Sequence, residues 1–165
     1  FHREYLHEGI KKSGFGGADF TGSFSIRVRS ADEVPAIAAR IGGGNEMDLA
    51  GALHGAEHAL IGVAPLPLMC DRRDIGGPSP TVHPATGAPT VFVYDGYEGG
   101  IGLTEKGYGR FGALAALSRD VVSACRCRDG CPACLYSPKC GNDNTPLDKA
   151  GAIRVLDELA AAYPP

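Results

Sequence analysis

The sequence predicts a small α+β domain with few strands, about three helices and a cysteine-rich loop near the carboxyl end. Its 165 residues match the size of one domain. Two segments have strand-like patterning and three have helical spacing of apolar residues. Five of the six cysteines lie between positions 125 and 140, which places an irregular loop between the last two helices.

Composition excludes several classes of protein. Hydrophobic residues make up 44% of the chain and charged residues 21%, as in globular proteins, so general disorder and a fibrous structure are excluded. The 24 glycines and 12 prolines indicate many tight turns. A formal charge of −3 gives no overall attraction to nucleic acid, so any such contact must come from a local patch.

The chain contains no apolar run long enough to span a bilayer. We therefore expect a cytoplasmic protein, associated with the nucleoid if it contacts DNA. The chain begins at Phe1 without an initiator Met or a signal-like segment, and we expect it to be a piece of a longer protein.

The amino-terminal part is predicted as a Gly-rich segment, residues 1–45, with one strand, belonging to the same domain as residues 46–165. The strand is expected at Phe24–Arg29, where apolar and polar residues alternate. An amphipathic helix is expected from Glu46 to about Gly62. Its buried stripe is formed by Leu49, Leu53, Ala56 and Leu60.

The middle of the chain is predicted to be irregular and then to enter the core. Six prolines between Ala64 and Pro89 argue against helix there. The following run, Thr90–Tyr94, is continuous, apolar and β-branched, which is typical of a strand buried on both faces. It ends at a turn, Asp95-Gly96.

Two further helices are predicted. One runs from about Thr104 to Cys125, with an apolar stripe of Phe111, Leu114, Leu117, Val121 and Val122. For the last helix, Thr145 is the expected N-cap, Pro146 the first helical residue and Asp148 the acid at the third position. Its buried stripe is Ile153, Leu156 and Leu159, and it stops before Pro164.

The clustered cysteines predict one structural zinc ion. Thiolates a few residues apart on a loop turned by Gly and Pro can converge on a tetrahedral ion, and Cys131-x-x-Cys134 is the usual chelating pair. Four of the five cysteines are needed, so two of Cys125, Cys127 and Cys140 complete the set. The spacing leaves that choice open, and we favour Cys125 and Cys127.

Disulfides and redox chemistry are the alternatives to zinc. Five thiols is an odd number, and most of them are too close in sequence to pair without strain. A redox CxxC usually opens a helix after a strand, whereas this one lies among other thiols. Cys70 stands apart and is interpreted as a buried small apolar residue.

A second motif is His54-Gly-Ala-Glu57-His58, in which both imidazoles share one face of the predicted helix. It matches the inverted zinc-peptidase pattern, where two histidines bind the metal and the glutamate is the general base. No downstream carboxylate stands out as the third ligand. We therefore favour histidines that hydrogen-bond to neighbouring loops, and keep a zinc metallohydrolase as an alternative.

Acidic residues gather at two turns. They can bind a hard cation or act as paired acids, but Asp in turns commonly caps backbone N–H groups, which is the interpretation we favour. The residues concerned are Asp71, Asp74, Asp95 and Glu98. The glycine-rich stretch from Gly96 to Gly102 lacks the lysine of a phosphate loop, so we predict no nucleotide site.

Taken together, these motifs resemble the C-terminal zinc-binding domain of MrfA-like DEAD/DEAH-box DNA helicases. The resemblance covers about Met47 to Leu159. The segments that carry it are Leu53-His54-x-x-Glu57-His58-Ala59-Leu60-Ile61, Cys70-Asp71-x-x-Asp74-Ile75-Gly76-Gly77, Val91–Tyr94 with Asp95-Gly96-x-x-Gly99-Gly100-Ile101-Gly102, the Cys125–Cys140 cluster with Cys140-Gly-Asn, and Leu147-Asp148-Lys149.

The resemblance implies an accessory domain of an ATP-dependent helicase that unwinds DNA 3′ to 5′ and serves DNA repair. Four cysteines would hold a structural zinc, and ATP and Mg²⁺ would act only in motor domains outside this chain. We therefore expect no catalytic residues and no enzymatic activity from this chain alone. Its expected partners are single-stranded or forked DNA and the motor domains in cis, with no membrane partner.

The cysteine loop also carries candidate DNA contacts. Arg126, Arg128 and Lys139 are expected to meet phosphates, and Tyr136 can stack on a base. Solvated charges that balance the thiolates are an equally good interpretation of the three cations. A third functional hypothesis is a zinc-stabilised module that docks a protein.

Overall fold

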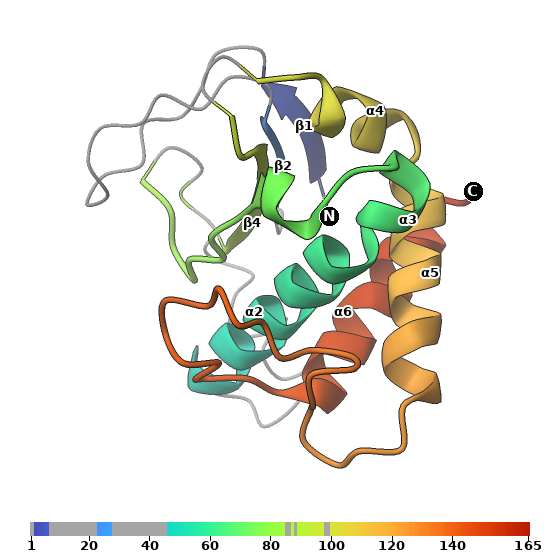
Figure 1. Cartoon of the computed structure of the whole chain (residues 1–165). Helices are drawn as coiled ribbons and strands as arrows, with labels where there is room; N and C mark the ends of the chain where they lie inside the picture. Colours follow the sequence, from blue (N-terminus) through green and yellow to red (C-terminus); the bar gives the residue numbers. More distant parts are fainter. Residues whose placement is uncertain (1, 7–22, 28–45, 85–86, 88, 98–99) are drawn as a thin grey trace.

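A four-stranded antiparallel sheet lies against a group of helices in the computed structural model (Figure 1). The structure describes residues 2–6, 23–27, 46–84, 87, 89–97 and 100–165. The strands are β1 (His2–Leu6), β2 (Ser23–Arg27), β3 (Ile75–Gly76) and β4 (Thr90–Asp95), in the order β1-β2-β4-β3. The predicted α+β class is confirmed.

Three long helices form the second layer. They are α2 (Glu46–Val63), α5 (Phe111–Ala124) and α6 (Lys149–Ala162), and each packs on the other two, while α2 also contacts β4. Shorter elements complete the described chain: α3 (Pro65–Leu68), the 3₁₀ turn η2 (Arg72–Asp74) and α4 (Leu103–Gly109). Helix α2 therefore connects the sheet to the other long helices (Figure 1).

Helix α2 has the predicted bounds, but it is not amphipathic. The expected stripe of Leu49, Leu53, Ala56 and Leu60 is buried, and so are His54, Glu57 and His58 on other faces. A helix covered on nearly every side needs small residues where a neighbour crosses it. A Cβ on Gly55 would lie 2.7 Å from the Cβ of Ala152, so glycine allows α6 to approach this closely.

The strand predictions are confirmed where the structure describes them. Strand β2 begins one residue before the predicted start, and residues 28 and 29 lie outside the described residues. Strand β4 is almost entirely buried and pairs with β2 and β3. Strand β1 was not predicted, because five polar-rich residues carry no clear alternation.

The expectation that prolines exclude helix from Ala64 to Pro89 was wrong at one point. Helix α3 begins at Pro65 and contains Pro67. Both prolines lie in the first turn, where backbone N–H groups have no intrahelical partner, so neither removes a hydrogen bond. Farther on, the carbonyls of Pro78 and Pro80 accept hydrogen bonds from Phe92 and Thr90, which fixes this segment beside β4.

The single helix predicted from Thr104 to Cys125 is divided into α4 and α5. Arg110 leaves the helical conformation between Gly109 and Phe111, where two glycines nearby lower helix propensity. Of the predicted stripe, Phe111, Leu114 and Val122 are buried, Val121 is half-buried, and Leu117 is exposed.

The predicted start of the last helix was also wrong. Helix α6 begins at Lys149, with Asp148 as an N-cap whose side chain makes no capping hydrogen bond. The preceding residues contact α2 instead: the carbonyl of Pro146 accepts from His54, and the N–H of Asp148 donates to the carbonyl of Gly51. Leu156 and Leu159 are buried as predicted, and Ile153 is half-buried.

Among the described residues, no helix is both long and apolar enough to cross a membrane.

Candidate metal centre

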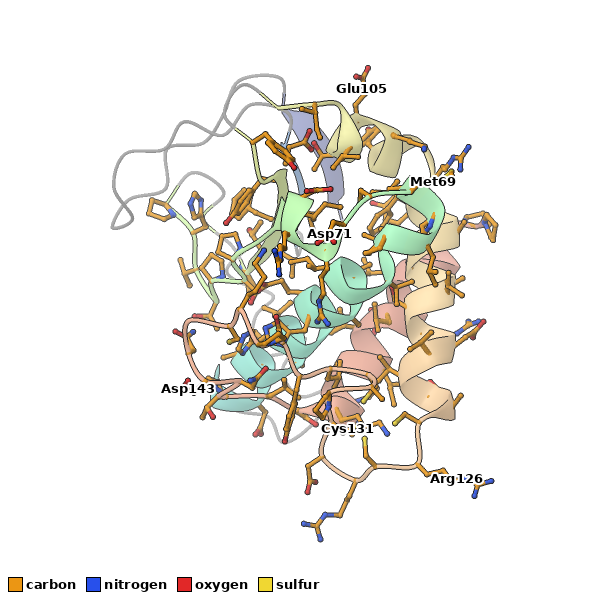
Figure 2. The ribbon with its side chains drawn as sticks, in the orientation of Figure 1. Met69, Asp71, Glu105, Arg126, Cys131 and Asp143 are labelled. Atoms are coloured by element: carbon orange, nitrogen blue, oxygen red, sulfur yellow. The ribbon has the colours of Figure 1, made fainter. Side chains whose placement is uncertain are left out.

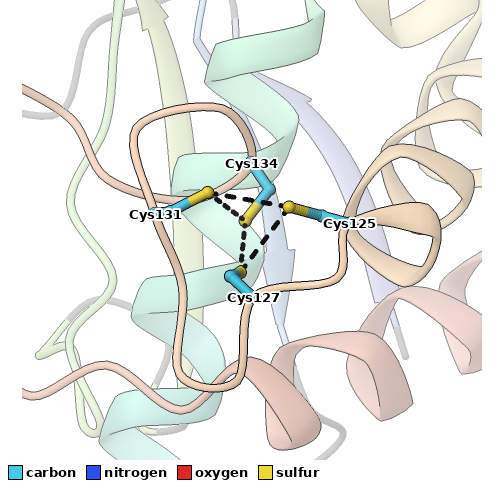
Figure 3. Close-up of side chains that lie close together, drawn as sticks. All are labelled: Cys125, Cys127, Cys131 and Cys134. Carbon is cyan, nitrogen blue, oxygen red and sulfur yellow. Dashed lines mark hydrogen bonds between the residues drawn. The ribbon is translucent and has the colours of Figure 1, made fainter.

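Four cysteine side chains converge after α5. The Sγ atom of Cys125 lies 3.6 Å from those of Cys127 and Cys131, and the Sγ atom of Cys134 lies 3.5 Å from Cys127 and 3.8 Å from Cys131 (Figure 3). A tetrahedral zinc ion with Zn–S bonds of about 2.3 Å places its sulfurs about 3.8 Å apart. The arrangement therefore fits one tetrathiolate zinc ion.

The chemistry of the thiols also suits a metal. Burial opposes ionisation of Cys127, but hydrogen bonds from the other three thiols lower its pKa to about 7. Burial, followed by the hydrogen bond with Cys127, raises the pKa of Cys134 to about 12. Ionisation is thus favoured at Cys127, while the Cys134 thiol keeps its proton until a bound divalent ion displaces it.

Local turns and one lysine hold this loop in place. The carbonyl of Cys131 accepts from the N–H groups of Cys134, Leu135 and Tyr136, which closes the turn that contains the chelating pair. Lys149, at the start of α6, donates from Nζ to the carbonyls of Cys125 (2.6 Å) and Cys127 (2.7 Å) and approaches the Cys127 sulfur at 3.5 Å. Its positive charge offsets part of the charge of four thiolates.

Lys149 contacts the candidate metal centre, and sequence reasoning did not single it out. It is buried, with 7% of its surface exposed, and a buried lysine usually needs partners of this kind. The only indication in the sequence was its place in Leu147-Asp148-Lys149.

Cys140 lies apart from the four converging cysteines. Its Sγ atom lies 3.3 Å from Nε2 of His54, and it forms a separate group with His54 and His58. The sequence left open which two of Cys125, Cys127 and Cys140 complete the zinc ligands. In the structure the favoured pair, Cys125 and Cys127, lies beside Cys131 and Cys134.

Both histidines of the His-x-x-Glu-His motif hydrogen-bond to loops, as expected. Nδ1 of His54 lies 2.7 Å from the carbonyl oxygen of Pro146, and Nδ1 of His58 lies 2.8 Å from that of Leu135. Burial, followed by the nearby charges of His54 and Arg72, lowers the pKa of His58 to about 4 despite the Leu135 hydrogen bond. Glu57 accepts a hydrogen bond from Ser79 at 2.5 Å.

The acidic residues cap backbone groups, as favoured from the sequence. Asp71 accepts from the N–H of Arg73, and Asp74 accepts from the N–H of Asp71 and from the Tyr97 hydroxyl. Asp95 accepts from three N–H groups at the start of α4: Ile101, Leu103 and Thr104. Glu98 lies outside the described residues.

The four candidate DNA contacts lie on two parts of the surface. Arg126 and Arg128 project from the loop that carries the cysteines, where Figure 2 shows Arg126 pointing away from the fold. Arg128 is 92% exposed and pairs with Asp129. Tyr136 is 36% exposed, and Lys139 donates to the carbonyl of Arg73 beside a cavity.

Cys70 is half-buried against the core and lies outside both groups of metal-ligating side chains. Burial, followed by the charges of Asp74, Asp71 and Asp95, raises the pKa of its thiol. It is therefore neither a member of the four-cysteine cluster nor a readily ionised thiol.

An α+β unit in which four thiols close around one point belongs to the class of small zinc-binding domains. A family model described as the MrfA Zn-binding domain matches residues 56–135 of this chain. The match includes the four converging cysteines and ends before Cys140. The chain belongs to the MrfA zinc-binding domain family.

Relatives differ widely in length. An uncharacterized protein of Methanocaldococcus jannaschii, MJ1572.1, is 41% identical over 110 residues, which is 65% of this chain and 98% of that protein. The ATP-dependent helicase YprA of Bacillus subtilis is 36% identical over 67% of this chain. The ATP-dependent helicase HRQ1 of Saccharomyces cerevisiae is 28% identical over 75%. This chain spans only 14% of YprA and 12% of HRQ1.

Solved structures give the same family. A crystal structure of the DUF1998 helicase MrfA bound to DNA aligns with a TM-score of 0.63 and 27% identity, over 88% of this chain and 18% of that one. A second, of MrfA bound to DNA and AMPPNP, aligns with a TM-score of 0.55 and 34% identity over 66% of this chain and 14% of that one. The resemblance inferred from the motifs is confirmed.

Proposed function

We propose that this chain is the structural zinc module of an ATP-dependent DNA helicase, with zinc held by Cys125, Cys127, Cys131 and Cys134. The observation that carries the proposal is the spacing of 3.5 to 3.8 Å between neighbouring Sγ atoms. Four thiolates close the coordination sphere of zinc, so this ion stabilises the loop and performs no chemistry.

The proposal that this chain is part of a helicase rests on its relatives. YprA and HRQ1 are named ATP-dependent helicases, and the aligned MrfA structures contain DNA. By analogy, the full-length protein would unwind DNA 3′ to 5′ during DNA repair. It would act in the cytoplasm, on the nucleoid. ATP and Mg²⁺ would bind in motor domains that pack against this module. The pairing of β2 with β4 supports one domain for residues 1–45 and 46–165.

The proposed DNA surface is centred on Arg126 and Arg128. Both are exposed and lie on the zinc loop, where Figure 2 shows Arg126 pointing away from the fold, so zinc would fix the backbone that carries them. Tyr136 is exposed enough to stack on a base, and Lys139 would add a phosphate contact farther along the chain. Each phosphate contact with single-stranded DNA adds about 0.7 to the slope of log K against log salt.

Metal analysis tests the zinc assignment. Cys131→Ala with Cys134→Ala should remove the loop zinc, whereas Cys70→Ala, which changes a thiol outside both groups, should leave it. If the double variant retained all its zinc, the ligand assignment would be wrong.

Salt-dependent binding tests the DNA surface. Arg126→Ala with Arg128→Ala should lower the salt slope for a single-stranded oligonucleotide by about 1.4, at about 0.7 per contact. The matched control is Arg119→Ala with Arg154→Ala, which removes the same charge from α5 and α6. An equal loss in both variants would indicate overall charge, and no loss in either would favour a module that docks a protein.

A further inference from the structure

Three potential metal ligands outside the four-cysteine cluster meet at one point. His54 and His58 extend from successive turns of α2, and Cys140 comes from the loop that precedes α6. One ligand atom from each lies within 4.8 Å of the others. The Sγ atom of Cys140 is 3.3 Å from Nε2 of His54, close to the spacing of about 3.5 Å expected for nitrogen and sulfur on one tetrahedral zinc ion.

The hydrogen bonds of both imidazoles leave the correct nitrogen for a metal. A carbonyl oxygen has no proton to give, so Nδ1 of His54 must donate to Pro146 and Nδ1 of His58 to Leu135. In a neutral imidazole this places the lone pair on Nε2. Metal-binding histidines commonly have this second hydrogen bond to a backbone carbonyl, which fixes both tautomer and ring orientation.

The sulfur is supported in the same way. The backbone N–H of Asn144 donates to Sγ of Cys140 at 3.3 Å, as is favourable for a sulfur that carries negative charge. Cys140 is only half-buried, whereas both histidines are buried, with 8% and 4% of their surface exposed. The three side chains thus form a set of two nitrogens and one sulfur, which suits zinc and other borderline metals.

The group faces a cavity, unlike the closed tetrathiolate. A cavity of about 730 Å³ is lined by all three side chains and by Glu57, Arg72 and Lys139. No fourth His, Cys, Asp or Glu among the described residues groups with the three. An ion held there would therefore keep one coordination position directed toward the cavity, as catalytic zinc sites do and structural ones do not.

We infer that His54, His58 and Cys140 form a second metal site, for Zn²⁺ or a similar divalent ion, with one open position facing the cavity. The third ligand that the His-x-x-Glu-His motif lacked is a cysteine 82 residues after His58, not a carboxylate. The two sites are linked, because Leu135 holds His58 through its carbonyl and directly follows the zinc-loop residue Cys134.

Cobalt titration of the metal-free 165-residue chain tests this site without any activity assay. Wild type should bind two equivalents, and both should show the visible absorption of tetrahedral Co²⁺. Charge-transfer bands from thiolate to cobalt grow with the number of thiolates, so the His54/His58/Cys140 site, with one thiolate, should add weaker bands than the tetrathiolate. A single equivalent that has the tetrathiolate spectrum would overturn the inference.

Variants assign each equivalent. Cys140→Ala should reduce bound metal from two equivalents to one and retain the tetrathiolate spectrum, whereas Cys70→Ala should keep two. Circular dichroism checks that the Cys140 variant is folded. If it is unfolded, His58→Gln provides the same test, because glutamine can still hydrogen-bond near Leu135. Two equivalents in a folded Cys140→Ala chain would show that Cys140 is not a ligand.

Added azide tests the open position. In the chain loaded with two Co²⁺ ions, azide should change the bands of the His54/His58/Cys140 site and leave the tetrathiolate bands unchanged. An unchanged spectrum up to high azide concentration would show that the position is closed. In the cobalt titration, a chain that bound metal at His54, His58 and Cys140 but not at the four cysteines would contradict the proposed zinc module. The present inference would then still hold.

Discussion

The two groups of potential metal ligands differ in their donor atoms and in the contacts that hold them in place. The four cysteines of the first lie within ten residues of one another, and their loop is braced by Lys149. The second joins a buried helix to a loop more than 80 residues away in sequence and faces a cavity. The first site therefore depends mainly on local turns, with Lys149 of α6 as its distant support, whereas the second depends on contacts between α2 and distant loops.

The comparison shows how a closed site can support an open one. The zinc loop ends at Cys134, and the next residue, Leu135, is fully buried and holds His58 by its carbonyl. A metal that fixes the loop also fixes this carbonyl.

Zinc removal should have the largest effect. Binding energy for a structural zinc is folding energy, on the order of 10 kcal/mol in small zinc domains, so Cys134→Ala should lower the free energy of unfolding by at least about 5 kcal/mol. Urea unfolding with and without a chelator measures this, and Cys70→Ala serves as control. Equal stability with and without chelator would contradict a structural role.

Lys149→Met should have the next largest effect. The change leaves the carbonyls of Cys125 and Cys127 without their donor and removes a nearby positive charge, at a cost of about 3 kcal/mol. Zinc affinity should fall by about 10- to 100-fold. Competition with a chelating dye measures the affinity. Lys139→Met, an exposed lysine outside the tetrathiolate loop, should leave it unchanged.

Gly55→Val should separate the two sites. Its Cβ would lie 2.7 Å from that of Ala152, so α2 and α6 must move apart, which costs about 1 to 3 kcal/mol. Binding at His54 and His58 should weaken, while the tetrathiolate equivalent should persist in the cobalt titration. Gly109→Ala, where an added Cβ meets nothing within 4 Å, is the control. Equal loss of bound cobalt at both sites would mean that the tetrathiolate also depends on the packing of α2 against α6.

Arg128→Ala should have the smallest effect on stability. The side chain is 92% exposed, and its pair with Asp129 is screened by solvent, so the melting temperature should not change measurably. The salt slope for DNA should nevertheless fall by about 0.7. A clear fall in melting temperature would show that this arginine supports the loop instead.

Local patterns carried the parts of the structure that could be predicted. Strand β4 was predicted from a continuous apolar run, helix α2 from the helical spacing of its leucines, and Cys131-x-x-Cys134 from its chelating spacing. The errors lie where tertiary contacts compete with local preference. Thr145-Pro146 has the pattern of a helix start, but Pro146 and Asp148 make hydrogen bonds with α2, and α6 begins later.

The assignment of Cys140 shows the same limit at the site. From the sequence it was one of three candidates to complete the zinc ligands, with Cys125 and Cys127 favoured, and only the fold brings it beside His54. Lys149 was similarly hidden, because the sequence does not show that the start of α6 meets the end of α5. Contacts between residues distant in sequence decide both cases.

X-ray absorption at the zinc edge of the Cys140→Ala chain, loaded with one equivalent of zinc, tests the central claim most directly. Four sulfur neighbours at about 2.3 Å and no nitrogen neighbours are predicted. Three sulfurs with a nitrogen or oxygen neighbour, or a chain that binds no zinc while remaining folded, would contradict the assignment of Cys125, Cys127, Cys131 and Cys134.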